Sequence, residues 1–135
     1  MLNHLSIGVS NLQRSIAFYD ATLGALGYVR LWTGKDAAGY GYPGEKNEPF
    51  AIKQEEIHTA LGSSARSHIA FTATTRERVN AFYDAAISNG AGDLGKPGLR
   101  PHYGENYYAT FVQDPDGYRL EGVCHAALKD SGGAK

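Results

Sequence analysis

Residues 4–21, HLSIGVSNLQRSIAFYDA, decide the fold, because residues 68–85, HIAFTATTRERVNAFYDA, repeat them later in the chain. The repeat keeps His4 in register with His68, and both stretches end in the same letters, AFYDA. Similarity within a chain at a fixed spacing is the signature of a duplicated structural unit. A duplicated unit pairs its own halves, so we expect equivalent residues, here two histidines, to be brought to one place.

The first half begins with alternating apolar residues, typical of a strand with one buried face, and continues with apolar residues at helical spacing. Leu12, Ile16, Tyr19 and Leu23 form the apolar stripe of the predicted helix. The expected elements are a strand over 2–9, a helix capped by Ser10 or Asn11 and ended by Gly24 and Gly27, a strand over 28–32, a short strand and loop within 34–47, and a strand over 50–54.

The second half repeats this order and predicts a second βαβββ unit. A strand is expected over 67–73, and Thr74 and Glu77 have the spacing of a capping box. The expected helix carries Val79, Tyr83, Ala86 and Ile87 as its stripe and stops at Gly90. Residues 91–106 are rich in Gly and Pro and are expected to be mostly loop, followed by strands over 107–113 and 118–125 around a turn at 114–117.

Length, composition and charge bound the class of protein. The 135 residues predict one domain over 1–127, with modules at about 2–60 and 66–126 and a flexible tail at 128–135. A net charge of −1 gives no electrostatic case for nucleic acid or a membrane surface. No apolar run is long enough to span a membrane, and no signal peptide is apparent. The one cysteine, Cys124, is expected in the core and suits a cytoplasmic protein.

Two βαβββ modules, a histidine early in the first strand of each, and the ending FVQDPDGYRLE at 111–121 resemble the vicinal oxygen chelate superfamily. Glyoxalase I, bleomycin resistance proteins, fosfomycin resistance proteins and extradiol dioxygenases belong to it. The resemblance covers about residues 2 to 126. It implies an α+β fold in which tandem βαβββ modules form a cupped mixed sheet around a central cavity, with the helices outside. It also implies His4, His68 and Glu121 as ligands of a divalent metal ion.

Lys53 is the repeat partner of Glu121 and stands where glyoxalase I has a further metal ligand. A protonated lysine is a poor ligand. Two histidines and one carboxylate then suit Fe or Mn, and also three-ligand Zn sites, with Ni as a further option. Lys53 could instead pair with Glu121 in place of a metal, or bind an anionic group of the substrate. Gly8 stands where glyoxalase I has an arginine for a glutathione carboxylate, which argues against a glutathione substrate.

Other residues are candidates for substrate contact. Arg119 shares the strand face of Glu121, and His125 flanks it. His102 and Tyr103 lie in a long loop rich in aromatic residues, and such loops beside a cavity are often functional. The alternative for this loop is simple packing of its own tyrosines. His58, in the connector between the modules, is expected to be solvated.

The first hypothesis is a small metal-dependent enzyme that acts on an oxygen-chelating substrate by lyase or isomerase, dioxygenase or addition chemistry. In it Glu121 is a ligand that could also serve as base, and Lys53, Arg119, His102 and Tyr103 orient the substrate. The second is a protein that sequesters a small molecule without catalysis, as bleomycin resistance proteins do. A homodimer is expected, since a symmetric dimer is the commonest oligomer. Whether the pocket lies within one chain or across two is left open.

Overall fold

The computed structural model describes residues 1–56 and 66–128. The first module contains a strand, a helix and three further strands. These are β1 (Leu5–Val9), α1 (Leu12–Ala25), β2 (Val29–Thr33), β3 (Ala37–Gly41) and β4 (Phe50–Gln54). The second module has the same order: β5 (Ile69–Thr72), α2 (Arg76–Ser88), β6 (Gly92–Leu99), β7 (Tyr108–Gln113) and β8 (Arg119–Cys124). The predicted α+β fold of two βαβββ modules is therefore confirmed. His58 lies outside the described residues.

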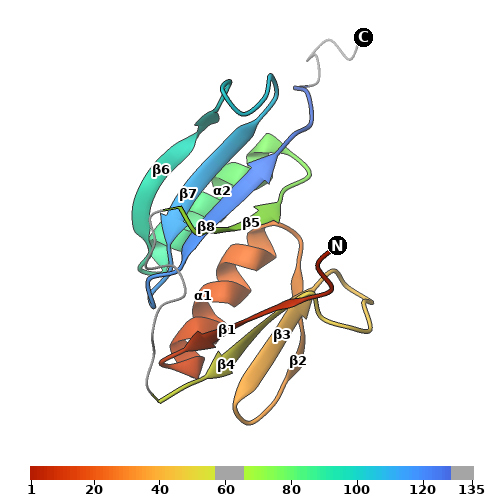
Figure 1. Ribbon diagram of the computed structural model, residues 1–135, viewed down its shortest axis with the longest axis vertical. Helices are drawn as coiled ribbons and strands as arrows, with labels where there is room; N and C mark the ends of the chain where they lie inside the picture. Colours follow the sequence, from red (N-terminus) through yellow and green to blue (C-terminus); the bar gives the residue numbers. More distant parts are fainter. Residues whose placement is uncertain (57–65, 129–135) are drawn as a thin grey trace.

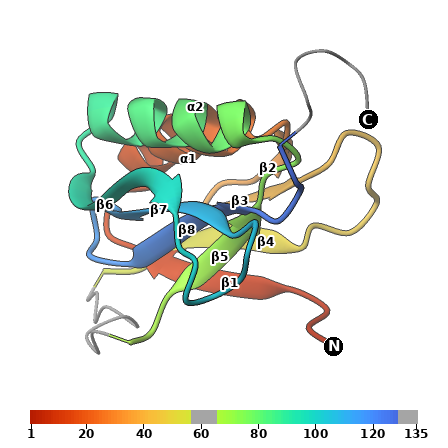
Figure 2. The same ribbon diagram turned by 90° about the horizontal axis from the view of Figure 1, so that it is seen from above.

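Each module builds its own four-stranded mixed sheet, in the order β1-β4-β3-β2 and β5-β8-β7-β6. The first strand of each module pairs in parallel with the last strand of that module, and the other pairs are antiparallel. Both helices lie in one layer and pack against each other, and both sheets lie beneath them (Figure 2). β1 and β5 run in opposite directions along the molecule (Figure 1). Each sheet consequently has one face towards the helices and one open face.

The helix stripes explain how each sheet is covered. In α1 the predicted residues Leu12, Ile16, Tyr19 and Leu23 are all buried. In α2 the buried residues are Val79, Phe82 and Ala86, while the predicted Ile87 is 38% exposed. Phe82 lies directly on Gly122 of β8, so the helix approaches that sheet where a strand residue lacks a side chain. Cys124 is buried in the core, as predicted.

Three expectations need correction. Residues 92–99 form the edge strand β6 and are not loop. The register of β6 shifts between Gly95 and Gly98, and this irregular stretch accommodates Pro97, as is common for proline at a sheet edge. The N-cap of α2 is Thr75 and not Thr74, because the Thr75 side chain accepts from the backbone N–H of Arg78. β1 and β5 begin at residues 5 and 69, so His4 directly precedes its strand.

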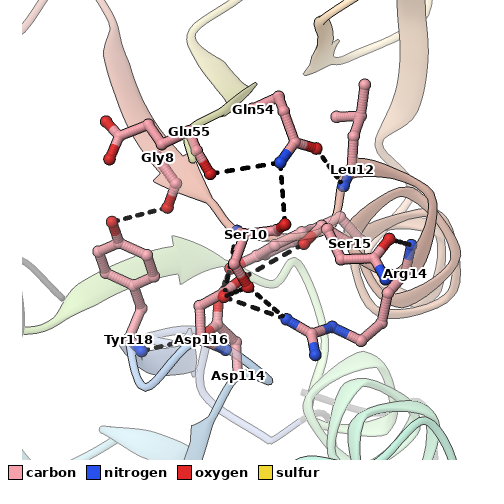
Figure 3. Close-up of polar contacts among 12 residues, drawn as sticks. Gly8, Ser10, Leu12, Arg14, Ser15, Gln54, Glu55, Asp114, Asp116 and Tyr118 are labelled. Carbon is pink, nitrogen blue, oxygen red and sulfur yellow. Dashed lines mark hydrogen bonds and ion pairs between the residues drawn. The ribbon is translucent and has the colours of Figure 1, made fainter. Parts of the chain in front are cut away.

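The turn at 114–117 of the second module docks onto the first turn of α1 in the first module (Figure 3). One Asp116 oxygen accepts from the Ser10 backbone N–H at 3.2 Å, from the Ser10 hydroxyl at 2.5 Å and from the Arg14 guanidinium at 3.1 Å. Tyr118, directly after the turn, donates its hydroxyl to the carbonyl of Gly8 at 2.8 Å. These contacts join the modules at the N-terminal end of α1.

No helix in the described part of the chain is both long and apolar enough to cross a membrane.

Candidate functional site

The open face of the second sheet carries Glu121. Ala70 of β5 and Phe111 of β7 are its neighbours across the strands, which places these three residues on one face. The residues on either side of Glu121, Leu120 and Gly122, face the core and α2 instead. Glu121 is nevertheless only 1% exposed, so its carboxylate needs partners that replace water.

His68 is the first partner of this carboxylate. Its Nε2 lies 3.0 Å from Oε1 of Glu121, and its Nδ1 lies 3.0 Å from the carbonyl oxygen of Arg66. A carbonyl oxygen can only accept, so Nδ1 carries a hydrogen. Nε2 is therefore the nitrogen that either holds a second proton towards Glu121 or presents a lone pair. A metal-binding histidine in proteins usually has this arrangement, with its other ring N–H bonded to a carbonyl or carboxylate.

Tyr107 is the second partner. Its hydroxyl donates to Oε2 of Glu121 at 2.5 Å, so each carboxylate oxygen has its own partner. Burial, followed by the hydrogen bond to Glu121, raises the pKa of Tyr107 to about 12, which keeps the hydroxyl a donor at neutral pH. Tyr107 was not among the predicted site residues. The signal was available, because Phe111 lies across from Glu121 and residues 107, 109 and 111 alternate onto the same side of β7.

A row of rings extends from Tyr107 to the surface. Ring centroids are 5.2 Å apart for Tyr103 and Tyr107, 4.2 Å for His102 and Tyr103, and 4.9 Å for Tyr107 and His125. Tyr103 is 61% exposed. The structure therefore brings the predicted residues His102 and Tyr103 next to Tyr107, one step away from the carboxylate of Glu121.

Two cationic side chains of this module lie near the open face, and one of them, Arg119, was predicted. Arg119 is half-buried on β8, across from Gln113, two residues from Glu121. Arg100, which the sequence analysis did not single out, lies over the Phe111 ring at 5.5 Å, and that ring in turn lies edge-on to His68. Arg100 thus contributes positive charge to the same open face.

Lys53 lies on the open face of the first sheet, and His4 directly precedes β1; both side chains are exposed. The Nδ1 of His4 lies 2.7 Å from the side-chain oxygen of Asn3, so in both histidines Nδ1 faces an oxygen. Lys53 pairs with Gly8 and Ala37 and makes no ion pair within the described residues. The ion-pair partner of Glu121 is His68, so the alternative in which Lys53 neutralises Glu121 is not found within one chain.

Glycines on this first face allow acidic side chains to lie flat on the sheet. The Glu55 carboxylate lies against Gly8, where any Cβ would overlap it. Glu48 and Trp32 lie in the same way on Gly39, and the Trp32 indole N–H donates to Glu48 at 3.0 Å. A backbone hydrogen bond and this indole bond lower the pKa of Glu48, with smaller effects of His4 and Lys53. The sequence analysis missed both acids because glycine positions alone do not say which side chain covers them.

The three predicted metal ligands do not all meet in one chain. His68 and Glu121 adjoin each other, but across residues 1–56 and 66–128 no group of three His, Cys, Asp or Glu side chains is close enough to hold a metal ion. His4 instead lines a mainly apolar cavity of about 270 Å³ between the modules, together with Leu5, Tyr28, Phe50, Ile69 and Phe71. Neutral imidazole and carboxylate fit a divalent metal. The described part of one chain thus supplies two adjacent donors, His68 and Glu121, of kinds that fit such an ion.

Comparison with known proteins places the chain in a family. The family model described as Glyoxalase/Bleomycin resistance protein/Dioxygenase superfamily matches residues 1–121. A glyoxalase/bleomycin resistance protein from Albidiferax ferrireducens is 29% identical, with a TM-score of 0.73 over 90% of this chain and 95% of that one.

More distant structures share the fold. The fosfomycin resistance protein FosX from Mesorhizobium loti is 16% identical, with a TM-score of 0.65 over 95% of this chain and 93% of that one. A glyoxalase I variant from Zea mays is 23% identical, with a TM-score of 0.69 over 90% of this chain and 45% of that one. Family match, repeat and topology agree: the chain belongs to the glyoxalase/bleomycin resistance protein/dioxygenase superfamily, the vicinal oxygen chelate family.

Proposed function

We propose that this protein is a divalent-metal-dependent enzyme acting on a small substrate that chelates the metal through two oxygens. The observation that carries the proposal is the pair formed by His68 Nε2 and Glu121 Oε1, 3.0 Å apart. Because Nδ1 of His68 is committed to a carbonyl, its Nε2 is available as a ligand beside a carboxylate oxygen. Family membership, together with a fold shared with a glyoxalase I and a fosfomycin resistance protein, supports an enzymatic role.

A divalent ion, Fe, Mn, Zn or Ni, would supply Lewis-acid stabilisation of negative charge on the substrate oxygens. His68 and Glu121 would hold the ion, and Glu121 would also serve as base for a proton taken from the substrate. Arg119, Lys53, His102 and Tyr103 orient the substrate, the two cations through its negative charge and the rings by stacking. Lyase or isomerase, dioxygenase and addition chemistry all remain compatible with this arrangement.

The carboxylate of Glu55, which lies beside Gly8, supports a substrate other than glutathione. Glu55 places a carboxylate against Gly8, in the place where the family resemblance puts an arginine for a glutathione carboxylate. Like charges at such a position repel each other. The proposed substrate therefore carries no carboxylate at the end of the site beside Gly8.

The third ligand, His4, comes in this proposal from a second copy of the chain. The support is that Nδ1 faces an oxygen in both His4 and His68, while the two histidines do not meet within the described part of one chain. β1 and β5, which follow these histidines, are both edge strands and so have a free side for a partner. A homodimer with two equivalent sites is the simplest assembly that joins them.

The test is metal binding by untagged protein. Metal-free protein is titrated with Mn²⁺, Fe²⁺, Zn²⁺ and Ni²⁺, and binding is measured by calorimetry and by the rise in Tm that mass action produces. His68→Ala and Glu121→Gln are expected to abolish the rise. Glu77→Gln, an exposed change in the first turn of α2, is the control and should keep it. Absence of binding and of any Tm rise in the wild-type protein would remove the enzymatic proposal.

Sequestration of a small aromatic compound is the second candidate. The cavity of about 270 Å³ between the modules, lined by Tyr28, Phe50 and Phe71 among others, favours it. Such apolar cavities with few polar groups are the usual form of ligand sites. If no metal binds, calorimetric binding of small aromatic compounds, weakened by a cavity-filling Ile69→Trp, is the expected result.

A further inference from the structure

Two independent contacts fix the carboxylate of Glu121. His68 takes Oε1 at 3.0 Å and Tyr107 takes Oε2 at 2.5 Å. Glu121 follows the core residue Leu120 on β8, and its side chain is 2% exposed. A buried carboxylate held at only one oxygen could still rotate about its last torsion, which is broad for glutamate. With both oxygens held, the orientation of the group is set.

The ring of Tyr107 is itself held in place. It lies between the rings of Tyr103, at 5.2 Å, and His125, at 4.9 Å in an edge-to-face arrangement. Its position immediately before β7 places it on the side of Phe111 and Glu121. The hydroxyl therefore approaches Glu121 from a fixed direction, at the end of the exposed row of rings.

The adjacent residue, Tyr108, differs from Tyr107 in the face of the sheet on which its side chain lies. Tyr108 points to the other side of the sheet, where its hydroxyl donates to Asn80 of α2 at 2.8 Å and its ring lies beneath Arg76. Two adjacent tyrosines thus bond to groups on opposite faces. Only one of them reaches the open face that carries His68 and Glu121.

We propose that Tyr107 is a positioning residue of the metal site: its hydroxyl holds Oε2 of Glu121, so that Oε1 is the oxygen presented beside Nε2 of His68. The proposal rests on the proposed metal-binding function. In this proposal Oε2 accepts the hydrogen bond that orients the carboxylate, and Oε1 is the metal ligand. The rings of Tyr103 and His125 also have a role in this proposal, because they hold the Tyr107 ring in place.

The experiment compares Tyr107→Phe with the matched control Tyr108→Phe. Each removes one hydroxyl, but only the first removes a partner of Glu121. The dissociation constants of Mn²⁺ and Co²⁺ are measured by calorimetry, and the visible spectrum of the Co²⁺ protein reports the ligand arrangement. We expect Tyr107→Phe to weaken metal binding about 10- to 100-fold and to change the Co²⁺ spectrum, the range found when an outer partner of a ligand is lost. Tyr108→Phe should change neither.

A metal-free measurement separates this proposal from the proposed function. The loss in urea midpoint caused by Tyr107→Phe is measured in the wild type and in Glu121→Leu, which cannot accept a hydrogen bond. A smaller loss in the second background supports the contact, and equal losses overturn it. If the wild type binds no metal, the proposed function fails, and the urea comparison still decides whether Tyr107 holds Glu121. If metal binds but Tyr107→Phe leaves affinity and spectrum unchanged, the positioning role is wrong.

Discussion

At the scale of the residue, two glycines show how the strands make room for different neighbours. Gly122 of β8 faces the ring of Phe82, which a Cβ would meet at 2.9 Å. Gly8 of β1 faces only the carboxylate at the end of the exposed Glu55 side chain. A packed ring in the core has no space to move into, whereas an exposed carboxylate can swing into water.

Gly122→Ala is therefore expected to destabilise the protein by about 1–3 kcal/mol, the usual cost of overpacking a core. Gly8→Ala, the same substitution at a half-buried strand position where only an exposed side-chain end has to move, should shift the free energy of unfolding by no more than about 0.5 kcal/mol, as substitutions away from packed features do. Urea unfolding of both variants measures the difference. Equal losses in the two variants would contradict this account of the Phe82 contact.

Asp114 gives a prediction for pH. Burial, the largest effect, raises the pKa of this carboxyl above its usual 3.8, although Tyr19 donates its hydroxyl to it. The folded state then keeps the proton to a higher pH than the unfolded state. The protonated Asp114 carboxyl therefore contributes to the free energy of unfolding in full below pH 3.8. This contribution is lost as the pH rises through the pKa that Asp114 has in the folded protein.

The measurement compares the wild type with Asp114→Asn, in which this titration is absent. The unfolding free energy of the wild type minus that of Asp114→Asn should fall as the pH rises from about 3 through the folded pKa of Asp114 and then level off. Groups unaffected by the change cancel in this difference. A difference that rises with pH would show that the hydrogen bonds to Asp114 outweigh its burial.

At the scale of the element, the start of α1 uses a residue from the other module. Asn11 caps the helix by accepting from the backbone N–H of Arg14 at 3.1 Å, which is a local contact. Asp116, far along the chain and 3% exposed, adds a negative charge at the same helix end (Figure 3). A carboxylate there is favoured by the helix dipole as well as by its hydrogen bonds.

Asp116→Ala is expected to lower the free energy of unfolding by about 1.5–3 kcal/mol, the range for hydrogen bonds to a charged group. Asp36→Ala, an exposed change between β2 and β3, is the control and should be close to neutral. Thermal and urea unfolding provide the values. A loss for Asp116→Ala no larger than that of the control would mean that the turn contributes nothing to the junction.

At the scale of the whole molecule, the two modules form hydrogen bonds to each other at equivalent positions of the repeat. The carbonyls of Gly8 and Thr72, at matching places after His4 and His68, each accept a tyrosine hydroxyl from the other module at 2.8 Å, from Tyr118 and Tyr28 respectively. This arrangement holds the modules with β1 and β5 running in opposite directions (Figure 1). The two histidines directly precede these strands, so the arrangement also sets where they lie.

A complementation experiment tests whether a second copy completes the site. His4→Ala and Glu121→Gln chains are each expected to bind no metal alone. In a mixed dimer, His4 of the second variant meets Glu121 of the first, so one of the two sites is intact. Coexpressed and purified mixed dimers should therefore regain about half of the wild-type metal content, since a symmetric dimer has two equivalent sites. No recovery in mixed dimers confirmed by mass spectrometry would contradict a shared site.

The sequence predicted what depends on local pattern and on the repeat. Alternation and helical spacing gave βαβββ twice, and the stripe of α1 is buried as expected. The pattern failed at residues 92–99, because glycine and proline obscure an edge strand whose pairing with β7 comes from elsewhere in the chain. It also failed to select Tyr107, because alternation gives the face of a side chain and not the atom that it reaches.

By itself the sequence determined the fold, the repeat, the presence of His4 and His68 just before matching strands, and the presence of Glu121 within the last strand. Only the tertiary structure decided that His68 and Glu121 adjoin while His4 lies at a cavity between the modules. The physical reason is that a strand pattern specifies faces within one sheet, whereas the relation between the two sheets depends on contacts such as Tyr118 with Gly8 and Asp116 with Ser10. Those contacts join residues that no local periodicity connects.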